Sequence, residues 1–224
     1  MITKKVITID GPAGSGKSTV AKLVAKRLGL NYLDTGAMYR ALTWASLEAK
    51  IDLSNNSAIL AIAESMDLNI SYQNGKLSVY LKGKDVSDAI RLPLVNESIS
   101  RISEVPEVRD IMVSKQRELA KSGAVVEGRD IGTVVFPDAE YKFYIDADFD
   151  IRVERRYKEM QAKELDLSRD DVSINLSKRD ISDKNRLHGP LVKAEDAIVI
   201  DTTGMSIDDV VDKILSYLGD KNDS

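Results

Sequence analysis

The sequence predicts an α/β fold with three layers, in which helices cover both faces of a five-stranded parallel sheet. The chain opens in the order strand, loop, helix, strand, with strands at residues 6–9 and 31–33, and this is the βαβ pattern of parallel sheets. Three later apolar runs have the length of buried strands, and each ends at or near an acidic residue. They are residues 124–127, 141–145 and 197–200.

Composition places the chain among ordinary globular proteins. Its 224 residues are 43% hydrophobic and 30% charged, and this length allows one sizeable domain with an insertion, or two small domains. The net charge of −4 argues against non-specific electrostatic binding to nucleic acid or to an anionic membrane. Because the chain has no cysteine, disulfides, thiol catalysis, zinc–cysteine sites and iron–sulfur clusters are excluded.

No segment has the pattern of an export signal or of a membrane span. The apolar run at residues 6–9 is shorter than the roughly 7 to 15 residues of a signal sequence. No run approaches the roughly 20 apolar residues that cross a bilayer. We therefore expect a cytoplasmic protein, and we expect it to be a monomer.

The first strand ends at an Asp-Gly-Pro turn, and a helix is predicted from Lys17, with Gly29 as its C-terminal cap. A small antiparallel insert is predicted within residues 67–87. It contains two alternating runs separated by Asn74 and Gly75, which is a strong hairpin signal, and a brief third strand. The three strands of the insert are residues 68–72, 77–81 and about 84–86.

The segment 149–186 is strongly charged and is predicted to be helical, with Ser168 and Asp171 spaced as a capping box. Ser206 and Asp209 repeat this spacing before a final amphipathic helix, and the polar tail beyond it is expected to fray. The apolar stripe of the final helix consists of Ile207, Val210, Val211, Ile214, Leu215 and Leu218.

A phosphate-binding loop (P-loop) follows the first strand and precedes the first helix, so both flanks fit the G-x-x-x-x-G-K-[ST] motif. Lys17 is expected to reach the β- and γ-phosphates of ATP, and the Ser18 hydroxyl to bind Mg²⁺. A glycine-rich turn that merely joins strand to helix is the alternative, which these flanks disfavour. The expected ATP-binding residues here are Gly11, Pro12, Ala13, Gly14, Ser15, Gly16, Lys17, Ser18 and Thr19.

Two arginines follow strands where open parallel sheets place their ligands. Arg40 lies one turn into a helix opened by residues 34–36, and Arg129 follows the strand at residues 124–127. The guanine-reading tetrad of regulatory GTPases is not matched by residues 182–185, which disfavours a GTPase switch.

The charged segment also carries side chains that share helix faces and could close over phosphates. A solvated face with ion pairs along the helix is the alternative. The two groups are Arg152, Arg155 and Arg156, and Arg179, Asp183 and Arg186. We expect Arg152 and Arg156 to contact ATP. The predicted catalytic set is Lys17, Arg129, Arg156 and Arg179.

Four motifs, in order along nearly the whole chain, resemble bacterial cytidylate kinases. They are residues 11–18, 33–40, 127–139 and 178–186. The resemblance implies a single P-loop nucleoside monophosphate kinase domain spanning residues 1–224. Its core would lie at about 1–60, 104–148 and 191–220, its nucleoside-monophosphate-binding region with the antiparallel insert at about 61–103, and its lid at about 149–190. Gly189 differs from the alanine of the family pattern and lies at the expected hinge of the lid.

The resemblance further implies which residues bind the acceptor. Ser100, Arg109 and Asp130 would face the cytosine, Arg40 and Arg129 would hold the phosphate, and Asp183 and Arg186 would reach the ribose. Thr35 and Tyr39 would line the same site. The only histidine, His188, precedes Gly189 and Pro190 and is predicted to be a turn residue, so no general base is assigned.

The predicted activity is Mg²⁺- and ATP-dependent phosphorylation of CMP and dCMP. A kinase of another small acceptor, such as shikimate or dephospho-coenzyme A, is an alternative. It would share the P-loop but need not share the antiparallel insert or Gly128-Arg129-Asp130. A nucleotide sensor without turnover is the alternative from another class.

Overall fold

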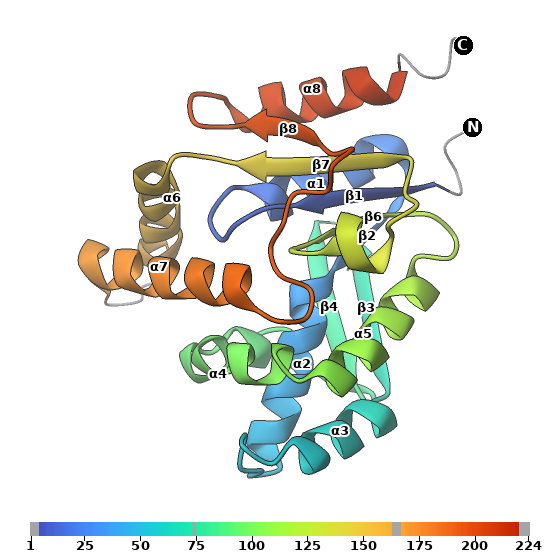
Figure 1. The fold of residues 1–224 in the computed structure, drawn as a ribbon, viewed down its shortest axis with the longest axis vertical. Coiled ribbons are helices and arrows are strands. Elements are labelled where there is room, and N and C mark those ends of the chain that lie inside the picture. Colours follow the sequence, from blue (N-terminus) through green and yellow to red (C-terminus); the bar gives the residue numbers. More distant parts are fainter. Residues whose placement is uncertain (1–4, 74, 163–166, 220–224) are drawn as a thin grey trace.

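The computed structural model describes residues 5–73, 75–162 and 167–219. Its main sheet has five parallel strands in the order β2-β6-β1-β7-β8, as predicted (Figure 1). Figure 1 shows α6 and α7 beside the end toward which the strands run, and the start of β1 at the opposite end. The strands are β1 (Val6–Asp10), β2 (Asn31–Asp34), β6 (Ala124–Gly128), β7 (Tyr141–Asp146) and β8 (Ile198–Asp201).

The central strands are buried on both faces, which is why they appear in the sequence as continuous apolar runs. Every residue of β6 is buried, and β1 is buried after its first residue. Helices α1 (Lys17–Leu28) and α8 (Ile207–Gly219) pack together on one face. The short π-helical turn η2 (Ile131–Val135) and α5 (Pro106–Leu119) contact one another on the other face.

The predicted insert is a separate antiparallel sheet in the order β3-β4-β5. Its hairpin pairs Ile70 with Val79 and Leu68 with Leu81, and β4 turns its apolar residues inward. The expected turn includes Asn74, which lies outside the described residues. The bounds are β3 (Leu68–Gln73), β4 (Lys76–Leu81) and β5 (Lys84–Asp85).

The remaining helices surround this insert and the end of β2. Asp34 ends β2 and accepts the backbone N–H of Ala37, so it caps α2, the helix that the Asp-Thr-Gly turn predicts. Helices α4 and α5 both begin with proline, which supplies a helical φ at a position where no N–H is needed. These helices are α2 (Thr35–Glu48), α3 (Asn56–Ser65), α4 (Pro93–Ser103) and the short 3₁₀ turn η1 (Ala89–Arg91).

The charged segment forms two helices, α6 (Phe149–Gln161) and α7 (Arg169–Asn185), and residues 163–166 between them lie outside the described part of the chain. The capping box of Ser168 and Asp171 is confirmed. Both helices share a small apolar cluster with Ala13 of the P-loop, apart from the main core. None of the helices in the described residues is long and apolar enough to cross a membrane.

The final helix also begins as predicted. The Ser206 hydroxyl accepts the Asp209 N–H, and the Asp209 carboxylate accepts the Ser206 N–H, at 3.2 Å each. Most of the predicted stripe is buried against the core, although Ile207 is half exposed. The tail that was expected to fray lies at residues 220–224, outside the described residues.

Candidate active site

The P-loop has the curled backbone that its motif predicts. Gly14 and Gly16 adopt positive φ angles of 75° and 90°, a conformation that glycine tolerates best. Lys17 begins α1, is buried, and donates from Nζ to the carbonyl oxygen of Pro12 at 2.9 Å. The Ser15 hydroxyl is buried without a hydrogen-bond partner among the described residues. Ser18 is half-buried and Thr19 is exposed on the first turn of α1.

The P-loop lysine is buried close to other cations. Burial, and after it the guanidinium of Arg129, lower the pKa of Lys17 to about 7, against the opposing effect of the Glu127 carboxylate. Arg129 also lowers the pKa of Arg179, after burial, to about 10. Cations brought together in this way are stabilised when an anion arrives among them. The arrangement therefore fits a polyphosphate.

Binding of MgATP at pH 8 is expected to take up most of one proton per chain, because Lys17, whose pKa is about 7 without a ligand, is mostly neutral at that pH and the triphosphate restores its charge. Calorimetry in two buffers of different ionisation enthalpy measures this uptake. Lys17→Arg is the control, since a guanidinium stays charged throughout and takes up nothing. Equal proton uptake by both proteins would contradict the assignment.

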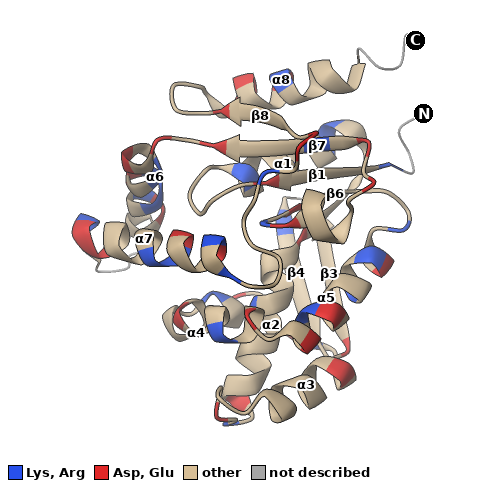
Figure 2. Ribbon diagram, in the orientation of Figure 1, with Lys and Arg blue, Asp and Glu red and all other residues tan. Residues whose placement is uncertain are grey.

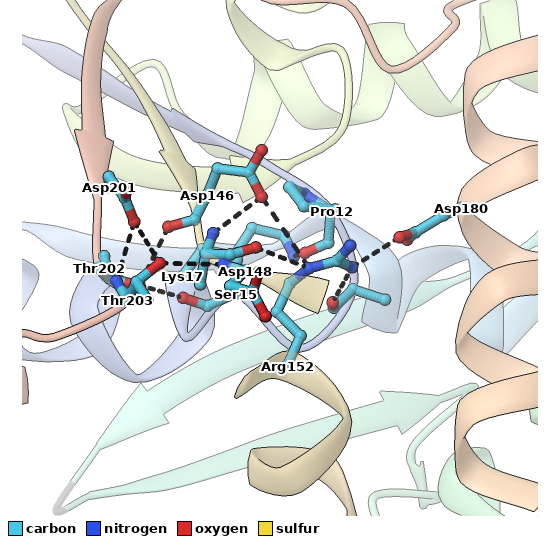
Figure 3. A network of polar contacts seen from close by, with 12 residues as sticks. Pro12, Ser15, Lys17, Asp146, Asp148, Arg152, Asp180, Asp201, Thr202 and Thr203 are labelled. Atoms are coloured by element: carbon cyan, nitrogen blue, oxygen red, sulfur yellow. Dashed lines mark hydrogen bonds and ion pairs between the residues drawn. The ribbon is translucent and has the colours of Figure 1, made fainter. Parts of the chain in front are cut away.

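Two arginines of α6 form hydrogen bonds with the P-loop. Arg152 donates to the carbonyl oxygen of Ala13 at 3.0 Å and pairs with Asp180 of α7 at 2.6 Å (Figure 3). Arg155 donates to the carbonyl oxygen of Ser15 at 3.3 Å and to that of Thr202 at 2.7 Å. In Figure 2 the basic residues of α6 accordingly lie on its side toward the sheet. Both guanidiniums hold α6 against the P-loop.

Two other predicted lid residues, Arg156 and Arg179, are partly exposed, and the ion pairs that they form among the described residues lie within their own helices. Arg156 pairs with Glu159 on its own helix at 2.6 Å, and its side chain is 32% exposed. Arg179 is 31% exposed and lies 4.0 Å from the carboxylate of Asp183. Arg156 and Arg179 are thus more available to a ligand than the buried Arg152.

Asp183 gathers three guanidiniums at the junction of α7 and the sheet. It accepts from Arg129 Nε at 2.6 Å, and Arg179 and Arg186 lie 4.0 Å and 3.8 Å away. Burial alone would raise the pKa of Asp183, but these three cations more than offset it and hold the pKa below its usual value. Two nitrogens of Arg186, Nε and Nη2, are buried without a hydrogen-bond partner among the described residues.

The two residues expected to read the base are in direct contact. Arg109 and Asp130 form a buried ion pair, and Arg109 also lies over the Tyr39 ring at 5.7 Å. Burial raises the pKa of Asp130, with Arg109 opposing the shift. Arg109 further donates to the carbonyl oxygen of Ser103 at 3.3 Å, and the half-buried Ser100 lies one turn earlier on α4.

The loop after α7 covers this pair. Gly189 has a φ of 59°, and a Cβ there would collide with Arg109 and Asp130. His188 is exposed in a bend outside the helices, which agrees with its expected place in a turn.

The first part of α2 completes the acceptor side. The Thr35 hydroxyl donates to the carbonyl oxygen of Glu127 at 2.8 Å, which joins α2 to β6. Arg40 pairs with Asp34 at 2.9 Å, and its Nε is buried without a hydrogen-bond partner among the described residues. Arg40 therefore has a free donor at the carboxyl end of β2.

Sequence reasoning missed several residues of this site. Glu127 is buried and accepts from the Tyr32 hydroxyl at 3.0 Å, and Asp180 fixes Arg152. Asp10, at the end of β1, accepts two backbone N–H groups from residues 131 and 132. An acidic residue at the end of a buried strand was the available signal for Glu127 and Asp10.

Comparison with known proteins connects this site to a family. A family model described as cytidylate kinase matches residues 7–220. The chain belongs to the cytidylate kinase family. Curated cytidylate kinases of Bacillus cereus (strain B4264) and Carboxydothermus hydrogenoformans are 47% and 45% identical to it, over 95% and 97% of this chain and 95% and 98% of theirs. The resemblance carried by the motifs is thereby confirmed.

A solved structure supports the fold separately from the family. An uncharacterised protein from Eubacterium ventriosum matches with a TM-score of 0.53 at 15% identity, covering 96% of this chain and 98% of its own. At that identity the likeness concerns the fold alone.

Proposed function

We propose that this protein transfers the γ-phosphoryl group of ATP to CMP and dCMP, giving ADP and CDP or dCDP in pyrimidine nucleotide metabolism. The proposal rests on one observation: in a chain of the cytidylate kinase family, the residues expected to bind the donor and the acceptor lie close together. The P-loop lysine and the Arg109–Asp130 ion pair lie at the same end of one sheet. Arg129 connects them, because it directly precedes Asp130 in the chain and its charge lowers the pKa of Lys17.

On the donor side, the P-loop backbone, Lys17 and Thr19 bind the triphosphate, and the Ser18 hydroxyl would hold Mg²⁺ beside it. The described residues contain no group of three or more acidic or histidine side chains that could hold a metal. This fits Mg²⁺, which usually keeps several waters and takes few protein ligands beside nucleotide phosphates. The ion would neutralise charge on the β- and γ-phosphates.

On the acceptor side, Arg40 and Arg129 bind the phosphate of CMP, and Arg109 and Asp130 bind the cytosine with Ser100. Asp183 and Arg186 reach the ribose, and Thr35 and Tyr39 line the site. The buried donors without partners on Arg40 and Arg186 support this division, because buried polar groups normally have a partner.

Catalysis then consists of positioning and charge stabilisation, since a loose phosphoryl transition state needs little covalent help. The acceptor oxygen is held in line with the γ-phosphorus, while Arg156 and Arg179 close over the transferring group. Segment 149–190 acts as the lid that excludes water, and about 61–103 acts as the acceptor-binding region on a core of the remaining segments. We propose a cytoplasmic monomer.

A coupled assay of ADP release tests the activity. CMP and dCMP should stimulate release strongly, UMP weakly and AMP hardly at all. Stimulation by shikimate or dephospho-coenzyme A instead would show a kinase of another small acceptor. ATP binding without release under any of these conditions would show a nucleotide sensor.

A further inference from the structure

Asp10 joins the two halves of the proposed site without belonging to either. It is the last residue of β1 and directly precedes Gly11 of the P-loop. Its side chain is buried, with 5% of the residue exposed. A carboxylate is costly to bury unless its oxygens are hydrogen-bonded, so its partners indicate what it does.

Those partners lie 121 and 122 residues further along the chain. Oδ1 accepts the N–H of Ile131 at 2.9 Å, and Oδ2 accepts the N–H of Gly132 at 2.8 Å. These are the first two amides of η2, whose N-cap residue, Asp130, makes no side-chain capping bond. Asp10 therefore caps this turn from a neighbouring strand, and each bond is charge-assisted.

The capped turn carries residues of the acceptor site. Residues 129–132, here called the acceptor turn, include Arg129 and Asp130. Close approach to β1 depends on Gly132, because a Cβ there would lie 3.0 Å from Thr8 Oγ1 and 3.4 Å from Asp10 Oδ2. Holding the two amides fixes the backbone from which both side chains project.

We propose that Asp10 is a positioning residue, which sets the acceptor turn at a fixed place relative to the P-loop by holding its two amides. The role rests on the proposed function, since it concerns the alignment of acceptor with donor. Misplacement of about 1 Å can cost a large factor in rate when catalysis depends on alignment. The same strand end thus positions donor and acceptor.

Protonation of Asp10 should loosen this hold. Burial raises the pKa of Asp10 to about 6, although the N–H groups of Gly132 and Ile131 oppose the shift. The charged and titratable groups around it are Lys17 of α1, Asp130 of the acceptor turn and Tyr144 of β7. A protonated carboxyl cannot accept on both oxygens with equal strength, so the acceptor turn is held above pH about 6 and released as the pH falls through that value.

Asp10→Asn is the decisive variant, because it keeps the shape and replaces one accepting oxygen by an NH₂ group that faces a backbone N–H. We expect kcat/KM for CMP to fall about 10- to 100-fold, with the dissociation constant of MgATP in the absence of CMP changed by less than about twofold. Thr8→Val is the matched control. It removes a buried hydroxyl on the same strand, one without a hydrogen-bond partner among the described residues, and should leave both constants unchanged.

The pH profile separates positioning from a general structural defect. The ratio of kcat/KM for CMP between wild type and Asp10→Asn should rise with pH through about 6. The titration of CMP itself cancels in this ratio. A ratio independent of pH, or an equal loss of MgATP affinity and CMP efficiency, would overturn the proposal.

Hydrogen exchange tests the same contact without any activity. The amides of Ile131 and Gly132 should exchange faster in Asp10→Asn than in wild type. In wild type, their protection relative to the intrinsic exchange rate at each pH should decrease below pH about 6. Unchanged protection of both amides would overturn the inference, even in a protein that proves not to phosphorylate CMP. If Asp10→Asn does not fold, the wild-type titration of these amides still decides.

Discussion

Replacing Lys17 by alanine is expected to lower kcat by about 100- to 1000-fold while leaving the fold intact. Lys17 Nζ is buried, and its contact among the described residues is the Pro12 carbonyl oxygen of its own loop. The side chain therefore contributes little to the packing of other elements. Its pKa of about 7 without a ligand indicates that its charged form is unfavourable until the negatively charged phosphates of ATP bind beside it. Steady-state kinetics with MgATP and CMP measure the loss.

Lys26→Ala is the control for this experiment. Lys26 lies on the same helix and is exposed, so its removal should change kcat by less than about twofold. Thermal unfolding of both variants shows that the fold is retained. Near-normal turnover by folded Lys17→Ala would refute the donor site.

The parts of the fold that the sequence predicted are those with strong local signals. The apolar runs that form most of β1 and β6 predicted strands buried on both faces, and the P-loop motif between β1 and α1 constrains both neighbours. The capping box at Ser168 is likewise a local feature. The P-loop and the capping box are determined by residues close together in the chain, and the strands could be recognised from their own apolar composition although they pair with distant segments.

Helices α3, α4 and α5 were not predicted, although proline opens two of them. Their apolar faces are completed by partners distant in sequence, such as α2 against α4, and tertiary packing supplies most of the stability of short helices. The functional pairings depend on distant partners as well. Arg109 and Asp130, or Arg129 and Asp183, are separated by 21 and 54 residues, and no periodicity within either segment indicates their partner.

Arg152 illustrates the limit most clearly. Its spacing with Arg156 places both on one face of a charged helix, and from sequence both were expected to contact ATP. In the structure Arg152 is buried between Ala13 and Asp180, whereas Arg156 is one-third exposed. Helical spacing identifies the shared face, but the partner of each guanidinium depends on how α6 packs against α7 and the P-loop.

The choice of pyrimidine is expected to depend on Asp130. Cytosine presents an amino donor and an unprotonated ring nitrogen where uracil presents a carbonyl and an N–H. The Asp130 carboxylate can accept from the amino group, and Arg109 can donate to the ring nitrogen or the carbonyl. Uracil would leave like groups facing one another, at a cost of about 1 to 3 kcal/mol for each mispairing.

Asp130→Asn should therefore lower the ratio of kcat/KM for CMP to that for UMP by about 5- to 150-fold, because each 1.4 kcal/mol corresponds to tenfold. The new NH₂ group can donate to the uracil carbonyl, and an amide leaves Arg109 a polar partner. Alanine would instead strand a buried guanidinium, which typically costs about 3 to 5 kcal/mol of stability. Arg40→Ala is the matched comparison, since loss of a phosphate contact should weaken both pyrimidines by the same factor. If Asp130→Asn lowered kcat/KM for CMP and for UMP by the same factor, Asp130 would not recognise the base. That result would not contradict the phosphoryl-transfer activity.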